Sequence, residues 1–302
     1  MKSPKAWGGA WAAIPTPFCA DLSVDFAALR RHVEFLCANG IDGIAACATT
    51  GEAATMTASE KMRVLGTVLD TVNGRVPVIA GVGTNDTRTT IENAKDAQNA
   101  GVDGLLVVTP YYNKPNQEGQ YRHFMTVADA VDLPQILYNV PGRTGTRCFP
   151  KTLGRLAKHP NIVGVKDATA DMVIASQTRI EAGPDFLMFS GDDGTTLPFI
   201  AVGGVGAISV VADIAPAIMH DIIALARAGR YADARVLHEK MLPLFSALFS
   251  DTSPIPLKAM LARTDLNYPG ALRSPLFEMD KEAADKLCAP LHDFIEAVKC
   301  MK

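Results

Sequence analysis

Short apolar runs alternate with longer helical patterns along most of this 302-residue chain. We expect strands at residues 10–14, 43–46, 76–80, 105–108, 135–138, 162–166, 186–189 and 206–210. Helical patterns cover residues 25–39, 58–72, 87–100, 118–131 and 172–181, a short one opens at Pro150, and one follows each of the last two strands. Eight such units within residues 1–230 predict a (β/α)8 TIM barrel, because parallel strands buried on both faces show runs of this kind. A doubly wound sheet is less suitable, since no Gly-x-Gly-x-x-Gly follows the first run.

The chain continues beyond the predicted barrel. We divide it into a catalytic barrel over residues 1–230 and a C-terminal helical region over residues 231–302, with helices expected at 231–249, 256–263 and 281–298. This second part is too small to require chemistry of its own. We interpret it as an appendage that packs on the barrel or forms an oligomer surface.

Composition excludes several classes of function. The net charge is −3 and no basic tract occurs, so neither nucleic acid nor an anionic membrane is an expected partner. No signal peptide or long apolar run is present. The six cysteines include no Cys-x-x-Cys pair, which favours free thiols and a cytoplasmic location. The six histidines are equally dispersed, so no metal site is predicted.

Lys166 ends the sixth apolar run, directly after Val165. A lysine at the end of a buried strand extends its amine into a poorly hydrated space, and desolvation lowers the pKa from roughly 10.4. A neutral amine can attack a carbonyl and form a Schiff base. The alternative is a plain surface lysine just beyond a strand end. Asp167 comes next and is turned to the opposite face by strand alternation, so we do not pair it with Lys166.

Chemistry in a (β/α)8 barrel lies at the C-terminal ends of the strands. The distinctive residues that fall there are Thr49, Thr50, Tyr112, Tyr138, Arg143, Lys166, Gly191 and Ile208. Each has an ordinary alternative. The Thr-Thr-Gly-Glu turn at 49–52 can cap a helix or hold a small carboxylate with its amides. Tyr138 can be a core aromatic residue or a proton shuttle, and Arg143 a loop charge or a bidentate carboxylate clamp. Their convergence at one rim favours function.

Six motifs occur in order along the chain: Thr-Thr-Gly-Glu from Thr49, Thr-Pro-Tyr-Tyr-Asn from Thr109, Tyr-Asn-Val-Pro-Gly-Arg-Thr-Gly from Tyr138, Gly-Val-Lys-Asp-Ala-Thr from Gly164, Ser-Gly-Asp-Asp from Ser190 and Gly-Gly-Val-Gly-Ala-Ile-Ser-Val from Gly203. Together they resemble the dihydrodipicolinate synthase (4-hydroxy-tetrahydrodipicolinate synthase) family, within the pyruvate-dependent class I aldolase (N-acetylneuraminate lyase) superfamily. The resemblance covers nearly the whole chain, including Ser253-Pro254-Ile255-Pro256-Leu257-Lys258. Ala48 departs from the glycine that usually precedes Thr-Thr-Gly-Glu, and its methyl group can crowd that loop.

The resemblance implies a Schiff-base lyase (EC 4.3.3.7) that condenses pyruvate with L-aspartate-4-semialdehyde in diaminopimelate and lysine biosynthesis. It implies an imine on Lys166, a proton relay of Tyr138, Thr49 and Tyr112, and pyruvate bound by Thr50, Gly191 and Ile208. Arg143 would bind the carboxylate of the second substrate. No cofactor is implied, because the protonated imine is itself the electron sink. The implied assembly is a homotetramer, a dimer of dimers in which Tyr112 reaches a neighbouring subunit's site.

Two other functions remain open from the sequence. One is a class I aldolase or dehydratase that acts on 2-keto-3-deoxy sugar acids or sialic acid and makes no use of Arg143. The other is a silent barrel that only binds a keto acid, which would not need the relay. The resemblance also bears on regulation. At the position where lysine-sensitive relatives have a glutamate this chain has Thr89, and Ala58 and Lys61 fall where the histidine-bearing helix lies, so we expect L-lysine to inhibit weakly or not at all.

Overall fold

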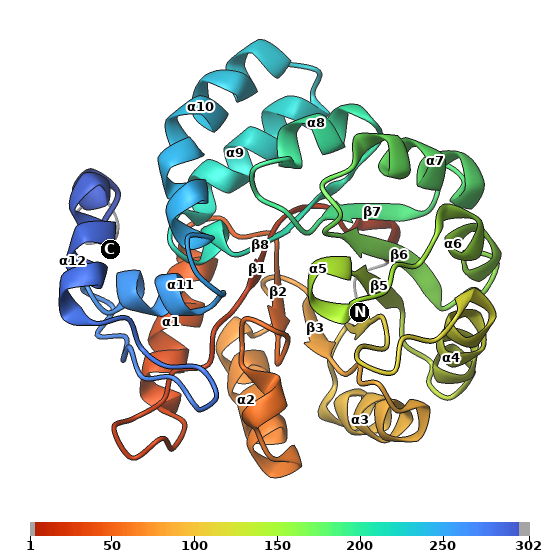
Figure 1. Ribbon diagram of the computed structural model, residues 1–302, viewed down its shortest axis with the longest axis horizontal. Helices are drawn as coiled ribbons and strands as arrows, with labels where there is room; N and C mark the ends of the chain where they lie inside the picture. The colour runs from red at the N-terminus through yellow and green to blue at the C-terminus, as the bar shows by residue number, and fades with distance from the viewer. Residues whose placement is uncertain (1–3, 296–302) are drawn as a thin grey trace.

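The computed structural model describes residues 4–295, and its eight strands close into a parallel barrel in chain order (Figure 1). The strands are β1 (Gly9–Ala13), β2 (Gly43–Ala46), β3 (Val78–Gly81), β4 (Gly104–Val108), β5 (Gln135–Asn139), β6 (Ile162–Asp167), β7 (Leu187–Ser190) and β8 (Gly206–Ser209). The ring closes where β1 pairs with β8. The predicted (β/α)8 TIM barrel is therefore confirmed.

The helices between the strands form the outer ring in Figure 1. They are α1 (Phe26–Ala38), α2 (Ala58–Val72), α3 (Thr87–Ala100), α4 (Gln117–Asp129), α5 (Pro141–Thr144), α6 (Pro150–Leu156), α7 (Met172–Ala182), α8 (Thr196–Ala201) and α9 (Pro216–Arg227). Short 3-10 turns lie at η1 (Pro4–Ala6), η2 (Ala53–Thr55) and η3 (Val211–Asp213). Local signals set several boundaries: Asp25 accepts from the Ala28 amide, and Thr57 and Glu60 form a capping box at α2.

Most expected boundaries hold within one or two residues, and the differences have local causes. β3 begins at Val78 rather than at residue 76, after Pro77, which has no N–H for a strand ladder. The Val78 amide donates to Asp103 at 2.9 Å. The sequence analysis missed α5, because a single turn opened by Pro141 is too short to show a helical period.

Aromatic and aliphatic side chains fill the barrel interior at its N-terminal end. Trp11 packs edge-on against both Trp7 and Phe189, with ring centres 5.2 and 5.5 Å apart. Gly43 on β2 leaves room for the Trp11 ring, since a Cβ there would lie 2.3 Å from it. The same inward-facing cluster includes Tyr138 and Ile208. The interior is thus filled by side chains at this end, and the chemistry of such a barrel lies at the C-terminal rim.

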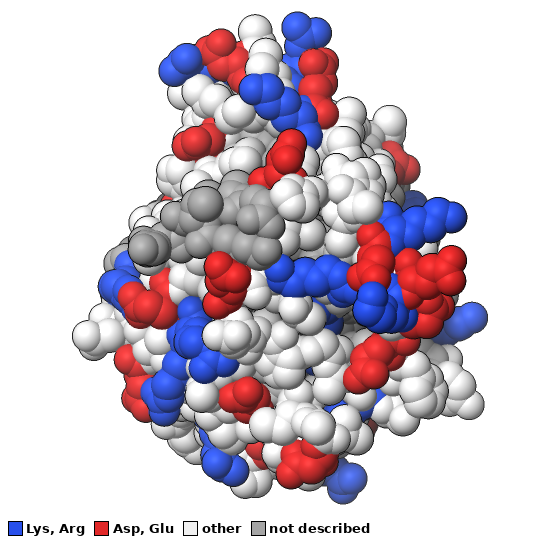
Figure 2. All heavy atoms as spheres, turned by 90° about the vertical axis from the view of Figure 1, so that its left-hand side faces the viewer, with Lys and Arg blue, Asp and Glu red and all other residues white. Residues whose placement is uncertain are grey.

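The C-terminal region contains α10 (Tyr231–Leu248), α11 (Ile255–Leu261), α12 (Lys281–Cys288) and a 3-10 turn η4 (Ala289–Leu291). Residues 296–298 of the expected last helix lie outside the described residues. The region packs against the barrel: Arg31 of α1 donates to the carbonyls of Leu266 and Asn267 at 3.0 and 2.9 Å. Figure 2 looks onto this side, where acidic and basic side chains are interspersed over the described surface.

Two further findings concern the chemistry of the chain. Of residues 4–295, no helix is long and apolar enough to cross a membrane. The described cysteines are all free thiols: Cys47, Cys148 and Cys288 are buried, while Cys19 and Cys37 are half-buried. Cys300 lies outside the described residues.

Candidate active site

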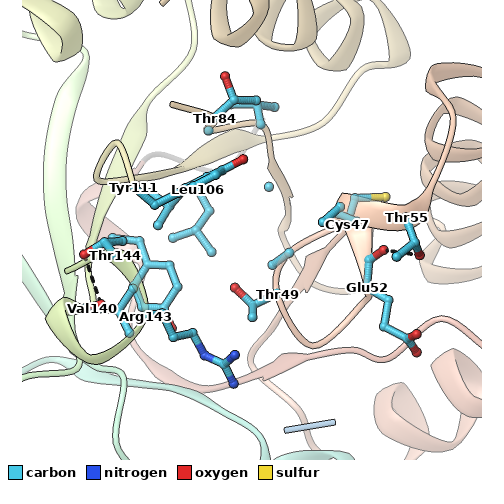
Figure 3. Close-up of a pocket in the computed structure, with 18 of the residues that line it drawn as sticks. Cys47, Thr49, Glu52, Thr55, Thr84, Leu106, Tyr111, Val140, Arg143 and Thr144 are labelled. Atoms are coloured by element: carbon cyan, nitrogen blue, oxygen red, sulfur yellow. Dashed lines mark hydrogen bonds between the residues drawn. The ribbon is translucent and has the colours of Figure 1, made fainter. Parts of the chain in front are cut away.

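A cavity of about 560 Å³ opens at the C-terminal end of the barrel (Figure 3). Of the residues predicted for the site, Thr49, Tyr138 and Arg143 line it. Ala48 lines it too and is half-buried against the barrel interior, so its methyl group forms part of the wall. Four residues from the C-terminal region complete the wall: Thr252, Ser253, Pro275 and Leu276. The sequence analysis assigned that region to packing and missed this contribution.

Lys166 lies in the barrel interior beside Tyr138. The two residues are paired in register on β5 and β6, and the Lys166 Nζ lies 4.4 Å from the centre of the Tyr138 ring. The lysine side chain is buried, with a residue exposure of 5%. Burial is the main cause that lowers its pKa to about 8, and the charge of Arg143 acts in the same direction. The carboxylates of Asp193 and Asp213 act in the opposite direction and raise the pKa. Such an amine is neutral often enough at physiological pH to act as a nucleophile.

A second buried lysine, Lys258, is a rival for that role, because burial also lowers its pKa to about 8. However, Lys258 forms an ion pair with Glu52 and donates to the Ala271 carbonyl at 2.8 Å. Within residues 4–295, the Lys166 amine has neither a salt bridge nor a hydrogen bond. An amine without such partners can attack a carbonyl, so the structure favours Lys166.

Tyr138 keeps its proton at neutral pH. The side chain is buried, and burial raises the pKa of the phenol to about 12, although Arg143 opposes this shift. A neutral phenol next to an amine can donate a proton to a developing hydroxyl and accept it back. The pairing of Tyr138 with Lys166 therefore fits a proton relay.

Two buried carboxylates, Asp193 and Asp213, were not predicted as site residues. Oδ2 of Asp193 accepts from the amides of Val210 and Val211, each at 3.1 Å. Burial raises the pKa of both carboxyls, and the effect of Asp193 adds to that of burial at Asp213. In its ionised form, each carboxylate raises the pKa of Lys166. Asp193 was visible in the Ser-Gly-Asp-Asp motif, whereas nothing in the sequence around Asp213 marks it.

Thr49 and Thr50 lie in the turn between β2 and η2. Thr50 is buried and Thr49 is exposed at the cavity. The turn is closed by the Glu52 amide, which donates to the Thr49 carbonyl at 3.0 Å, and by Thr16 Oγ1, which donates to the Gly51 carbonyl at 2.8 Å. Successive amides in such a turn form a concave anion site.

Gly191 lies next to the lysine, and neither Gly191 nor Ile208 belongs to the cavity wall. A Cβ at Gly191 would lie 3.1 Å from both Cγ and Cε of Lys166, so glycine leaves room for the lysine side chain. Ile208 is fully buried in the interior cluster with Tyr138. The opposite strand face carries Asp167, whose Oδ1 accepts from the Thr169 amide at 2.8 Å. This agrees with the predicted alternation.

Arg143 extends from α5 toward the side of the cavity that carries Thr49 (Figure 3). One of its terminal nitrogens donates to the Ser253 carbonyl at 3.2 Å, so the C-terminal region orients the side chain. The guanidinium remains largely exposed to the cavity. It is thereby available to bind the carboxylate of a ligand.

Tyr112 does not line this cavity and lies at the protein surface instead. It is 87% exposed, and its φ of 71° lies in the left-handed region that a bulky residue rarely adopts. Tyr111, its neighbour, lines the cavity instead. Among the described residues, no group of three or more histidine, cysteine, aspartate or glutamate side chains could hold a metal ion.

The buried Lys166 amine lies beside a phenol at the C-terminal end of a (β/α)8 barrel. These features define a Schiff-base lyase of the class I aldolase type. Comparison with known proteins assigns it to a family. Residues 6–293 match the model of the Dihydrodipicolinate synthetase family, and the chain belongs to this family.

Individual relatives agree with the family assignment. The chain is 46% identical to the 4-hydroxy-tetrahydrodipicolinate synthase of Pelobacter propionicus, over 95% of this chain and 98% of that protein. A solved structure of the chloride-inhibited dihydrodipicolinate synthase from Acinetobacter baumannii, complexed with pyruvate, superimposes with a TM-score of 0.92 at 41% identity, covering 95% and 98% of the two chains. A monomeric dihydrodipicolinate synthase variant gives a TM-score of 0.92 at 37% identity, covering 95% and 97%.

Proposed function

We propose that this chain condenses pyruvate with L-aspartate-4-semialdehyde, as the 4-hydroxy-tetrahydrodipicolinate synthase step of lysine and diaminopimelate biosynthesis. The observation that carries the proposal is the pairing of Lys166 with Tyr138 beside a cavity that Arg143 lines. A lysine amine supplies the nucleophile for a ketone, a phenol supplies the proton, and a guanidinium binds the carboxylate of a second substrate.

The first half of the reaction takes place on Lys166. Its neutral amine attacks the pyruvate carbonyl, and the carbinolamine loses water with a proton from Tyr138, leaving a protonated imine. Thr49 and Thr50 bind the pyruvate carboxylate through their turn, Gly191 leaves room for the lysine side chain, and Ile208 packs in the interior cluster with Tyr138. The buried carboxylates of Asp193 and Asp213 stabilise the positive charge of the imine. The Tyr138 phenolate then takes a proton back from the methyl group of the imine, which gives an enamine.

The second half joins the two substrates. The enamine carbon attacks the aldehyde carbon of the semialdehyde, whose carboxylate is bound by Arg143, and the new hydroxyl takes a proton from the relay. The amine of the semialdehyde then attacks the imine carbon and displaces Lys166, which closes the ring and releases the product. In this sequence the lysine is regenerated, and the chain needs no cofactor to carry charge.

We further propose that the active species is a homotetramer built as a dimer of dimers. The exposed Tyr112 is positioned to complete the relay of a partner subunit, which gives a function to its left-handed backbone. Besides Tyr112, the apolar side chains of Val173 and Ile180 on α7 are 66% and 80% exposed and offer a second contact surface between subunits.

A cytoplasmic location and no nucleic-acid or membrane partner fit the free cysteines and the mixed charge of the surface.

The substrate assignment is tested by offering purified enzyme and pyruvate a panel of aldehydes. We expect L-aspartate-4-semialdehyde to be used with a kcat/KM at least about a hundredfold above that of sugar-derived aldehydes without a matching carboxylate. Pyruvate release from 2-keto-3-deoxy acids or sialic acid is measured in parallel. A preference for the sugar-derived substrates would contradict the proposal and assign Lys166 to a different aldolase reaction.

A further inference from the structure

The C-terminal region reaches the turn of Thr49 and Thr50 through one buried ion pair. Lys258 of α11 pairs with the carboxylate of Glu52, and their side chains are 0% and 1% exposed. The other carboxylate oxygen, Oε2, accepts from the backbone amide of Arg273 at 2.9 Å. Both oxygens of Glu52 are thus bound by the C-terminal region, the second across 221 residues of chain.

Glu52 is itself held in an uncommon backbone conformation. Its φ of 52° and ψ of 34° lie in the left-handed region, which is unfavourable for a residue with a long side chain. This conformation directly follows Thr49, Thr50 and Gly51 and ends the same turn, so fixing Glu52 fixes the end of that turn. In Figure 3 the Glu52 side chain points away from Thr49, which suits an anchor rather than a substrate contact.

The groups around the ion pair hold it in place. The ring of Phe18, which is fully buried, lies 4.3 Å from Lys258 Nζ and 4.3 Å from the guanidinium carbon of Arg273. The Arg273 guanidinium in turn donates to Glu60 at 2.5 and 3.1 Å and to the Thr55 carbonyl at 3.0 Å. Lys258 and Arg273 thus both lie over the Phe18 ring, and each is paired with a glutamate, Glu52 or Glu60. These contacts connect the C-terminal region to the segment between β2 and α2.

The same region also contacts Arg143. Ser253, whose carbonyl accepts from the Arg143 guanidinium at 3.2 Å, lies five residues before Lys258. Residues 253–258 therefore contact Arg143 directly, and they reach the turn of Thr49 and Thr50 through Glu52. The turn proposed to bind pyruvate is reached through the Lys258–Glu52 ion pair. Arg143, proposed to bind the semialdehyde, is reached through the Ser253 carbonyl.

We propose that Glu52 and Lys258 are positioning residues for pyruvate: their ion pair fixes the turn whose amides bind the pyruvate carboxylate. The inference rests on the proposed function of Thr49 and Thr50 in that role. Neither Glu52 nor Lys258 touches the reacting atoms. Losing the pair therefore loosens the carboxylate site and leaves the chemistry on Lys166 intact.

The test compares Lys258→Met, Glu52→Gln and the double variant in the full-length enzyme. We expect each to raise the KM for pyruvate at least about tenfold, while kcat at saturating pyruvate stays within about threefold. Lys258→Met leaves a buried carboxylate without its cation and lowers the melting temperature. The double variant removes both charges, so its melting temperature returns much of the way to that of the parent. Its KM for pyruvate stays raised, because the ion pair is still absent. Arg230→Met, which removes an exposed pair with Asp233, is the matched control and changes neither quantity.

Two outcomes overturn the proposal: a double variant whose pyruvate KM lies within about twofold of the parent, or a KM that recovers together with the melting temperature. Either would make the pair a stabilising contact alone. Borohydride trapping at saturating pyruvate separates this result from failure of the proposed function. If the positioning proposal alone is wrong, the parent and the variants still form a reduced adduct on Lys166, whereas a parent without that adduct contradicts the proposed reaction itself.

Discussion

Lys166 and Tyr138 occupy paired positions on neighbouring strands, and the lysine Nζ lies 4.4 Å from the centre of the tyrosine ring. Burial shifts the pKa values of the two groups in opposite directions, but in both groups it disfavours the charged form. It lowers the pKa of the amine to about 8 and raises that of the phenol to about 12, so both shifts increase the neutral fraction of the group. The barrel interior thus places a nucleophile beside a proton donor.

The pH dependence of adduct formation follows from the lowered pKa of Lys166. With a pKa of about 8, about a tenth of the amine is neutral at pH 7, against about one part in 3,000 at the ordinary value. We expect the kcat/KM for pyruvate to rise about tenfold per pH unit below 8 and to level off above it. A profile of initial rates between pH 6 and 10 measures this.

Asp193→Asn checks the sign of that dependence. The carboxylate raises the pKa of Lys166, so its removal shifts the rising limb of the profile to lower pH. Asparagine retains an oxygen for the amides of Val210 and Val211. An unchanged limb, or one displaced to higher pH, would contradict the assignment of the limb to Lys166.

Arg143→Ala tests the clamp for the second substrate. Losing a charge-assisted bidentate contact costs on the order of 2–4 kcal/mol, or about 30- to 1,000-fold in kcat/KM for the semialdehyde. Pyruvate adduct formation on Lys166 is expected to change far less. Arg122→Ala, which removes an exposed arginine of α4, is the matched control. Equal loss in both half-reactions would contradict a role specific to the semialdehyde.

Tyr112 supplies a test of assembly. If it completes the relay of a partner subunit, mixing Tyr112→Phe chains with Lys166→Ala chains restores part of the activity, because some sites then contain both residues. Each variant alone stays nearly inactive. Sedimentation at assay concentration should show a species larger than the monomer. A fully active monomer would contradict the proposal.

Weak or absent inhibition by L-lysine stays a prediction, and the contacts of Thr89 support it. This side chain donates to Asp86 at 2.6 Å within the N-cap of α3, so it has neither the charge nor the freedom to bind an ammonium group. Losing a charge-assisted contact costs about 1.5–3 kcal/mol, and Lys61 in the cavity wall adds repulsion. Titrating L-lysine against the initial rate should give half-inhibition only above about 1 mM. Half-inhibition at lower concentration would show the prediction wrong.

The parts of the fold that sequence predicts well are those with local causes. α2 begins where expected because Thr57 and Glu60 supply a capping box, and it ends before Asn73, which adopts the left-handed conformation of a C-cap. The inward direction of Lys166 follows from strand alternation once Val165 is placed in the outer core. In contrast, α5 is one turn long and leaves no periodic signal.

The parts of the site that sequence did not predict depend on contacts between distant segments. Ser253 reaches Arg143 across 110 residues, and Arg273 reaches Glu52 across 221. No local pattern encodes either contact. Asp213 likewise gains its importance only from burial near Lys166, which composition and spacing do not reveal.

The central claim is that Lys166 forms the imine, and trapping measures this most directly. Purified enzyme is incubated with pyruvate and borohydride, digested, and the modified peptide is located by mass spectrometry. The structure predicts one reduced pyruvate adduct per chain, on Lys166, and none in Lys166→Ala. Lys258, which is also buried but is paired with Glu52, serves as the internal comparison. An adduct on Lys258, or one that persists in Lys166→Ala, would contradict the account.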